Sequence, residues 1–189
     1  GTGILTLTGT SYLINYQAAL LSVAYRNSSD IPSTQTRTVS FVVHDGNVLS
    51  KAVTRQIAIT AVNDIPVLEG IEAEPLMYTD YAAAVSITGT LTVTDADNTN
   101  IESAVVSISA NYQNGADILS FTNASGISGS WNSSSGILNL TGKSSTTNYQ
   151  AALRSITFMN SLDNPSVLTR IVSFTVNDGN SSSTAVSRQ

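Results

Sequence analysis

The chain has 189 residues, a net charge of −5, a sequence pI of about 4.5, no cysteine and a single histidine. Hydrophobic residues make up 41% of it and charged residues 11%, so it can bury a core and is not a disordered chain. The acidic balance argues against a nucleic-acid partner, the lack of cysteine excludes thiol chemistry, and no apolar run is long enough to span a membrane.

The beginning of the chain recurs at its end. Residues 3–56 align without a gap with residues 136–189, and 33 of the 54 aligned positions are identical. Gly3 aligns with Gly136, which gives an offset of 136 − 3 = 133 in residue number. Chance does not give that identity, so the sequence predicts a tandem array whose units have the length of this offset.

The first residue of the chain does not coincide with the start of a repeat unit. Residues 1–62 are predicted to be the C-terminal half of one unit, residues 63–66 a linker, and residues 67–189 a nearly complete next unit that lacks its last strand, the counterpart of Ile57–Thr60. The chain opens in mid-pattern with no visible signal peptide, so we expect it to be part of a longer protein. Residues 1–62 must then rest on something outside their own sequence.

Strand patterns dominate the rest of the chain. Alternating apolar and polar residues predict strands over 87–95, 103–111, 117–122, 136–142, 154–160 and 169–179. Glycine-rich hairpins around Gly115 and Gly126–Gly129 are expected to be surface excursions. One short helix is predicted over Asn148–Leu153, with Asn148 as its N-cap, and again over Asn15–Leu20. About seven short strands per unit predict an all-β, immunoglobulin-like antiparallel sandwich.

Acidic turn motifs follow two of these strands and occupy the linker. They are Asn63-Asp64, Asp95-Ala96-Asp97 and Asp178-Gly179. Loops that follow alternate strands can converge at one end of a sandwich, and Ca²⁺ takes six to eight oxygen ligands that one loop rarely supplies. These residues are therefore candidate calcium ligands.

The alternative is ordinary turn chemistry, because Asp-Gly and Asp-x-Asp-Asn are common turn formers. An EF-hand is excluded, since that pattern would need glycine at Asn100 and glutamate at Val106. Glu69 and Glu72 could add a carboxylate, or could simply be exposed strand charges. The only histidine, His44, aligns with Asn177 in the repeat and is expected to be a turn residue.

Several stretches resemble cadherin repeats. "LTVTDADNTNIESAVVSI" is similar to the cadherin segment with Asp-Ala-Asp, "FTVNDGNSSSTAVSRQ" to the segment with Asp-Gly before the last strand, and "ITAVNDIPVL" to the linker with Asn-Asp and Pro. "YQAALRSITF" and "VSFTVNDG" are similar to the cadherin-like tandem repeats of large bacterial surface adhesins.

This resemblance implies a metal set of Asn63, Asp64, Asp95, Asp97 and Asp178 at the junction, with Asp45 serving the junction before it. The chain departs from cadherins where an acidic cluster should precede the strand after the helix. The corresponding stretches, "LTGTSYLIN" and "LTGKSSTTN", carry no carboxylate, so one or two ions are expected at the junction in place of three.

The function expected from these features is structural. We predict no enzyme, but a length of extracellular, cell-surface stalk or filament whose partners are neighbouring repeats or other copies of the chain. Two alternatives stay open. Trp131 could form part of a carbohydrate- or surface-binding module, although covering an edge of the core is its simpler role, or the chain could assemble into filaments by strand exchange.

Overall fold

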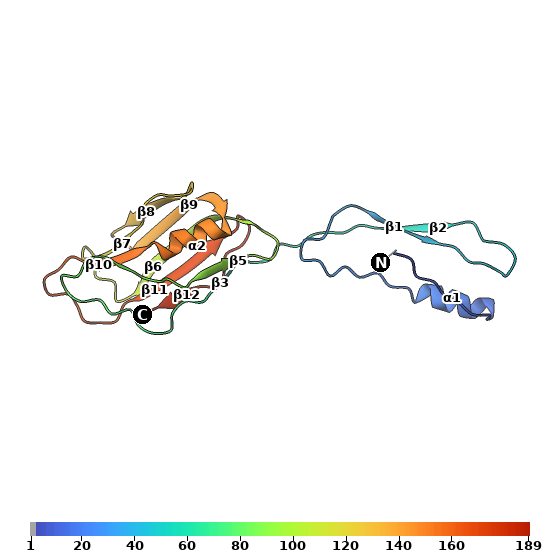
Figure 1. Cartoon of the computed structure of the whole chain (residues 1–189), viewed down its shortest axis with the longest axis horizontal. Helices are drawn as coiled ribbons and strands as arrows, with labels where there is room; N and C mark the ends of the chain where they lie inside the picture. Colours follow the sequence, from blue (N-terminus) through green and yellow to red (C-terminus); the bar gives the residue numbers. More distant parts are fainter. Residues whose placement is uncertain (1–2) are drawn as a thin grey trace.

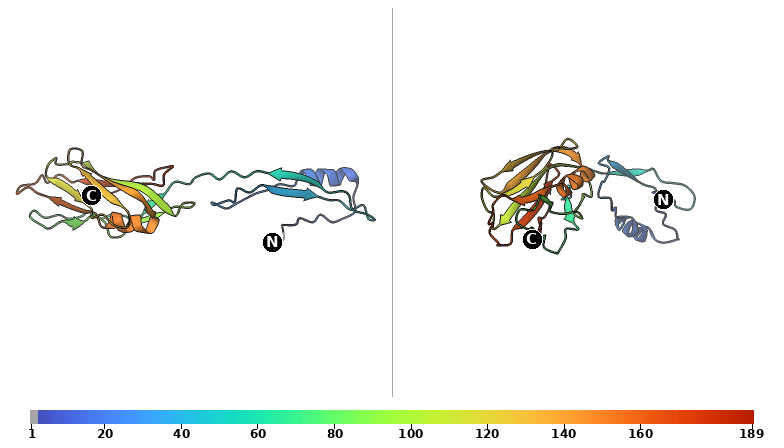
Figure 2. Two further views of the ribbon diagram at one scale, coloured as in Figure 1. Left: turned by 90° about the horizontal axis from the view of Figure 1, so that it is seen from above. Right: turned by 60° about the vertical axis from the view of Figure 1, so that its left-hand side comes forward.

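The computed structural model describes residues 3–189, which form two parts joined end to end by an extended linker (Figures 1 and 2). The N-terminal segment, residues 3–62, contains helix α1 (Leu13–Leu21) and the antiparallel hairpin of β1 (Arg37–Phe41) and β2 (Val53–Ile57). The C-terminal body, residues 67–189, contains every other helix and strand. Within residues 3–189 no helix is long and apolar enough to cross a membrane.

The C-terminal body is built from antiparallel sheets. A five-stranded sheet has the order β12-β11-β6-β9-β8, a three-stranded sheet the order β4-β10-β7, and β3 pairs with β5. The strands are β3 (Val67–Glu69), β4 (Val85–Ser86), β5 (Thr92–Thr94), β6 (Asn100–Ala110), β7 (Asp117–Ser120), β8 (Ser128–Asn132), β9 (Ile137–Ser145), β10 (Thr157–Asn160), β11 (Ile171–Asn177) and β12 (Val186–Arg188), and helix α2 (Thr146–Arg154) joins β9 to β10. The chain is mostly β, as the strand patterns predict.

One apolar core lies between these sheets. Burial alternates along β11, where Val172, Phe174 and Val176 are buried and their neighbours are not. This period of two is the pattern from which the strand was predicted. Leu119 of β7 and Phe158 of β10 join the same core from the three-stranded sheet. The core therefore holds the strand ends, and the loops that follow them, in fixed positions.

The short helix lies where it was expected, but its cap was predicted wrongly. Helix α2 begins at Thr146, and the side chain of Ser145 caps it by accepting the backbone N–H of Asn148 at 3.1 Å. Asn148 lies inside the first turn instead, where its side chain donates to Ser144 Oγ. Tyr149 is fully buried and donates from its hydroxyl to the Gly142 carbonyl at 2.7 Å, which fixes the helix against β9.

Two other local predictions differ from the structure. Of the single strand expected over 87–95, only Thr92–Thr94 (β5) forms a strand. The chain bends before it, where the Glu72 carboxylate accepts hydrogen bonds from Thr88 Oγ1 and the Gly89 amide. The hairpin expected as an excursion around Gly126–Gly129 belongs to the sheet, since β8 pairs with β9 along its whole length. Gly129 lies so close to Phe121 that a Cβ there would be 2.7 Å from its ring.

The structure reproduces the internal repeat at the level of local geometry. Helices α1 and α2 have the same length and occupy equivalent positions in the two copies. The isolated bridge between His44 and Leu49 recurs between Asn177 and Ser182. However, α1 buries none of its residues, whereas α2 packs against the core. The N-terminal segment thus shares the helix, the hairpin of β1 and β2 and the Asp-Gly turn with residues 136–189, but it lacks the counterparts of β9 and β10 and the core that supports them.

Candidate metal centre

The side chain of Asn63 connects the linker to two loops of the C-terminal body. Its Nδ2 donates to Asp178 Oδ2 at 2.8 Å. Its Oδ1 accepts from Asn98 Nδ2 at 3.1 Å and from Asn180 Nδ2 at 3.0 Å. These partners follow β5 and β11, so one side chain joins three segments that are far apart in the sequence.

Asp178 is held in place by the turn that it begins. Its Oδ1 accepts the backbone N–H groups of Asn180 and Ser181, both at 2.7 Å, which leaves Oδ2 for the linker. Burial opposes its charge, but the hydrogen bonds from Ser181, from Asn63 and from Asn180 outweigh burial and lower the pKa of Asp178. The side chain is therefore an ionised carboxylate at neutral pH.

The pKa of Asp95 is shifted in the opposite direction to that of Asp178. Its Oδ1 accepts the backbone N–H groups of Asp97 at 3.1 Å and Asn98 at 2.8 Å, whereas its Oδ2 is buried and has no hydrogen-bond partner. Burial, followed by the proximity and the charge of the Asp97 side chain, raises the pKa of Asp95 even though both backbone hydrogen bonds lower it. A buried carboxylate oxygen without a donor is costly, and a cation is the partner that would remove this cost.

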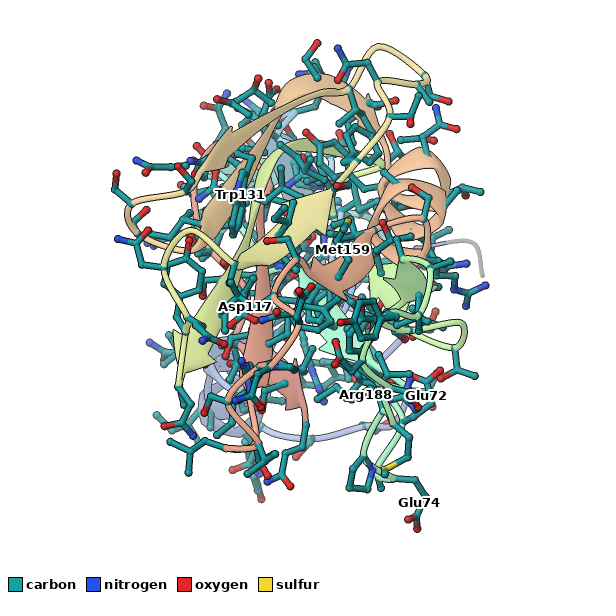
Figure 3. All side chains as sticks on the ribbon, turned by 90° about the vertical axis from the view of Figure 1, so that its left-hand side faces the viewer. Glu72, Glu74, Asp117, Trp131, Met159 and Arg188 are labelled. Atoms are coloured by element: carbon teal, nitrogen blue, oxygen red, sulfur yellow. The ribbon has the colours of Figure 1, made fainter. Side chains whose placement is uncertain are left out.

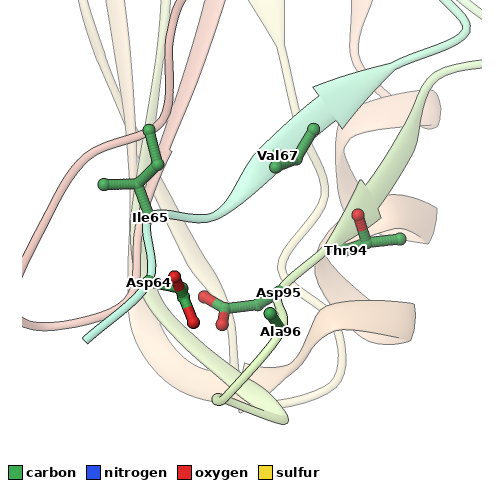
Figure 4. Close-up of a pocket in the computed structure, with 6 residues that line it drawn as sticks. All are labelled: Asp64, Ile65, Val67, Thr94, Asp95 and Ala96. Atoms are coloured by element: carbon green, nitrogen blue, oxygen red, sulfur yellow. The ribbon is translucent and has the colours of Figure 1, made fainter. Parts of the chain in front are cut away.

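Asp64, in the linker, lines the same pocket as Asp95. The carboxyl groups of Asp64 and Asp95 point toward one another across an open pocket, as Figure 4 shows. The other residues that line the pocket are Ile65, Val67, Thr94 and Ala96. The pocket offers two carboxylates in largely apolar surroundings, and carboxylates are the ligands that hard cations prefer.

The structure therefore gathers the five predicted ligands at one end of the body, but in two connected groups. Asp64 and Asp95 line the pocket and Asp97 lies in the same turn as Asp95, whereas Asp178 accepts a hydrogen bond from the side-chain amide of Asn63. Asp97 Oδ1 accepts from Asn98 Nδ2 at 3.2 Å, so Asn98 links the two groups. Among residues 3–189, no group of three or more His, Cys, Asp or Glu side chains is close enough together to hold a metal ion by itself.

Asn180 also belongs to this network, although the sequence did not predict it. The available signal was its recurrence, because Asn47 occupies the same place after Asp-Gly in the first copy of the repeat. Nothing local in the sequence shows that its side chain reaches Asn63, which is 117 residues away.

The turn that contains Asp45 has the same geometry in the N-terminal segment. Asp45 Oδ1 accepts the backbone N–H groups of Asn47 and Val48, both at 2.8 Å. The hydrogen bond from Val48, and after it the one from Asn47, lowers the pKa of Asp45. His44 Nδ1 accepts the Gly46 amide at 3.0 Å, as Asn177 Oδ1 accepts the Gly179 amide, so His44 is a turn residue as expected.

Two other candidates have roles outside this centre. Glu72 accepts from Thr88 and Gly89 and lies 3.5 Å from Arg188 Nη1 (Figure 3). Trp131 is half-buried against the core, and its ring meets that of Tyr112 edge-on at a centroid distance of 6.2 Å. Neither residue is directed toward the pocket of Asp64 and Asp95.

Comparison with protein-family models, with curated proteins and with solved structures found no match to this chain. Its function is therefore argued from its own geometry.

Proposed function

We propose that this chain is a structural segment of an extracellular, cell-surface repeat protein, in which cadherin-like β-sandwich units follow one another and calcium stiffens their junctions. The internal repeat, the antiparallel sheets around one core and the end-to-end arrangement of the two parts support this proposal (Figure 2). A stack of repeats of this kind adds length by adding units, because each unit contacts only its neighbours.

The observation that carries the calcium part is the buried Oδ2 of Asp95, which has no hydrogen-bond partner, on a carboxyl group that lies opposite that of Asp64. Asp64 and Asp95 would hold the ion from the pocket. Asp97, Asp178 and the side-chain oxygen of Asn63, which would complete a donor set made of oxygen atoms only, would have to leave hydrogen bonds that they make in this structure. Such a set suits calcium better than a transition metal. The ion would supply positive charge where burial now disfavours the carboxylate of Asp95.

The residues of the chain do part of the stiffening themselves. Asn63 lies in the linker and binds loops that follow β5 and β11, so it restrains the direction in which the linker leaves the body. Asp64, the next residue, would add a second point of attachment through the ion. Two adjacent residues anchored in this way leave the linker few bond rotations in which to bend.

The test is calcium titration of the whole chain by calorimetry, together with melting and solution scattering in calcium and in chelator. We expect saturable binding, a higher melting temperature and a longer, narrower particle with calcium. Asp95→Asn should abolish binding, whereas Asp163→Asn, which removes one charge from an exposed loop, should leave it unchanged. Melting and particle length that do not respond to calcium would refute the calcium part.

A further inference from the structure

The N-terminal segment has an apolar face that no other part of the described chain covers. Leu5 is 67% exposed, whereas its counterpart Leu138 is 2% exposed in the C-terminal body. Tyr25 is 44% exposed, whereas its counterpart Phe158 is 9% exposed. Leu7 and Val43 differ in the same way from the fully buried Leu140 and Val176. The counterparts of these four side chains all belong to one core, so the exposed side chains together mark a contact surface.

The C-terminal body shows what covers the equivalent face. Strand β9, which contains Leu138 and Leu140, lies between β6 and β8, and Phe158 of β10 pairs with Leu119 of β7. Strands β6, β7 and β8 all belong to residues 67–135. The covering segment is therefore the first half of the same repeat.

The polar contacts of the two copies agree with this assignment. In the C-terminal body, Arg170 Nε lies 3.1 Å from the buried carboxylate of Asp117, which is labelled in Figure 3, and Asn160 Nδ2 donates to the same carboxylate at 2.6 Å. Arg188 lies beside Glu72 in the same view. Asp117 and Glu72 both belong to residues 67–135.

The N-terminal segment retains the basic and amide members of these contacts and lacks the acids. Its residues at the equivalent positions are Arg37, Arg55 and Asn27. Arg37 even binds the carbonyls of Ser33 and Gln35, as Arg170 binds those of Ser166 and Leu168. Within residues 3–189, however, no salt bridge includes Arg37 or Arg55.

We propose that this face, formed by Leu5, Leu7, Tyr25, Arg37 and Val43, is the docking surface for a half-unit with the chemistry of residues 67–135. The half-unit supplies apolar strands to the face and two carboxylates, placed as Asp117 and Glu72 are, to Arg37 and Arg55. This inference rests on the repeat part of the proposed function and is independent of its calcium part.

The half-unit that we assign to this face is one joined ahead of Gly3 in the same polypeptide. Gly3 has φ +70°, as has Gly136, which closes the turn between β8 and β9 by donating to the Asn132 carbonyl at 3.0 Å. Gly3 thus has the backbone conformation that its counterpart Gly136 adopts between two paired strands. A second copy is a poorer source, because its residues 67–135 are already covered by its own residues 136–189.

The test places a copy of residues 67–135 directly ahead of Gly3 of the full chain and compares amide hydrogen exchange with that of the unextended chain. Residues 4–8 form no strand in the structure, whereas their counterparts in β9 pair on both sides. We expect exchange at the amides of Ile4–Leu7 to slow by about 100-fold or more in the extended chain. Unchanged exchange there would overturn the proposal.

Three variants of the extended chain test the recognition itself. Arg37→Ala, and separately Asp117→Asn in the added copy only, should each return the exchange of Ile4–Leu7 toward that of the unextended chain. Arg26→Ala removes the same charge from a position equivalent to Met159, which pairs with no carboxylate, and should leave the protection intact. Equal effects of Arg37→Ala and Arg26→Ala would refute the role of the carboxylate.

The unextended chain distinguishes the source of the half-unit. Its exchange and its mass by light scattering are measured over a range of concentrations, and we expect a monomer with an unprotected N-terminal segment. Protection of Ile4–Leu7 that rises with concentration, together with a dimer, would overturn the assignment and give the face to a second copy. Because none of these experiments contains calcium, their failure would be separate from failure of the calcium site.

Discussion

The amide nitrogen of Asn63 lies 2.8 Å from Oδ2 of Asp178, and this hydrogen bond ties the linker to a loop 115 residues further along the chain. Asp178 is ionised, and its other oxygen is already used by its own turn. The bond therefore joins a preorganised acceptor to the one linker residue that also accepts from Asn98 and Asn180. Side-chain hydrogen bonds therefore order the junction without an ion.

Asn63→Ala should loosen this junction. It removes one hydrogen bond to a charged group, two between neutral side-chain amides and one to the Asp64 carbonyl, for which we expect a loss of about 1–3 kcal/mol in the free energy of unfolding of the C-terminal body. Urea denaturation followed by the fluorescence of Trp131, the only tryptophan, measures this loss. Asn47→Ala, in the equivalent turn of the N-terminal segment, is the control and should change stability by less than about 0.5 kcal/mol. Equal effects would show that the Asn63 contacts do not hold the linker.

Asp95 predicts a pH dependence with the opposite sign to that of most native carboxylates. Its pKa is raised, so its ionised form destabilises the fold above that pKa, and the destabilisation is lost as the pH falls. In chelator, Asp95→Asn should therefore be more stable than the natural chain at pH 7. The difference should shrink as the pH is lowered toward about 4, where the unfolded carboxyl also binds a proton.

Thermal melting of both proteins between pH 7 and pH 4 tests this prediction. The side-chain oxygen of the asparagine in Asp95→Asn would still accept from the amides of Asp97 and Asn98, so the comparison isolates the buried oxygen. A variant that is less stable than the natural chain at pH 7 would mean that the charge of Asp95 is compensated without an ion.

Glu72 predicts a pH dependence of stability with the sign that is usual for a native carboxylate. Burial opposes its ionisation, but hydrogen bonds from Thr88 and Gly89 and the charge of Arg188 lower its pKa to about 2. The stabilisation is therefore complete above the pKa of an unfolded glutamate, about 4.3, and is lost as the pH falls through 2. From the shift, we expect Glu72→Gln to lower the free energy of unfolding at pH 7 by up to about 3 kcal/mol.

Urea denaturation at pH 7 and at pH 2.5 checks both the size and the sign, since the loss should be smaller at the lower pH. Glu74→Gln is the matched control, because the exposed side chain of Glu74 projects away from the body (Figure 3). It should be nearly neutral at both values of pH. A loss for Glu72→Gln that grows as the pH falls would contradict the assigned contacts.

The repeat explains how much of the fold could be predicted from the sequence. Alternation along β11 and the recurrence of the short helix are local patterns, so both elements were found. The bend at Thr88 was missed because it depends on Glu72, a residue 16 positions away. The cap at Ser145 was missed because asparagine and serine are both good caps and only the backbone shows which one lies outside the helix.

The candidate site was predictable to a similar degree. Turn motifs after strands identified the loops that meet, and the alignment of the two copies of the repeat identified the boundary between units. The sequence did not indicate that the amides of Asn98 and Asn180 converge on Asn63, since contacts over such separations leave no local pattern. It also did not show that Asp178 binds an amide while Asp95 is left with a buried, unpartnered oxygen.

The last prediction uses the repeat as its own control. Arg170→Ala removes the cation from a buried pair and leaves the carboxylate of Asp117 with hydrogen bonds from Asn160 and the Gln113 amide but no opposite charge. Breaking such a pair on one side costs about 3–5 kcal/mol. Arg37→Ala removes the equivalent side chain where no carboxylate is present, so in the same unextended chain it should cost less than about 0.5 kcal/mol. Urea denaturation followed by far-ultraviolet circular dichroism, which reports on both parts of the chain, compares the two. If the two losses are equal, the arginine at this position acts through its contacts with the carbonyls of its own loop, and the carboxylate supplied by the first half of the repeat contributes nothing to stability.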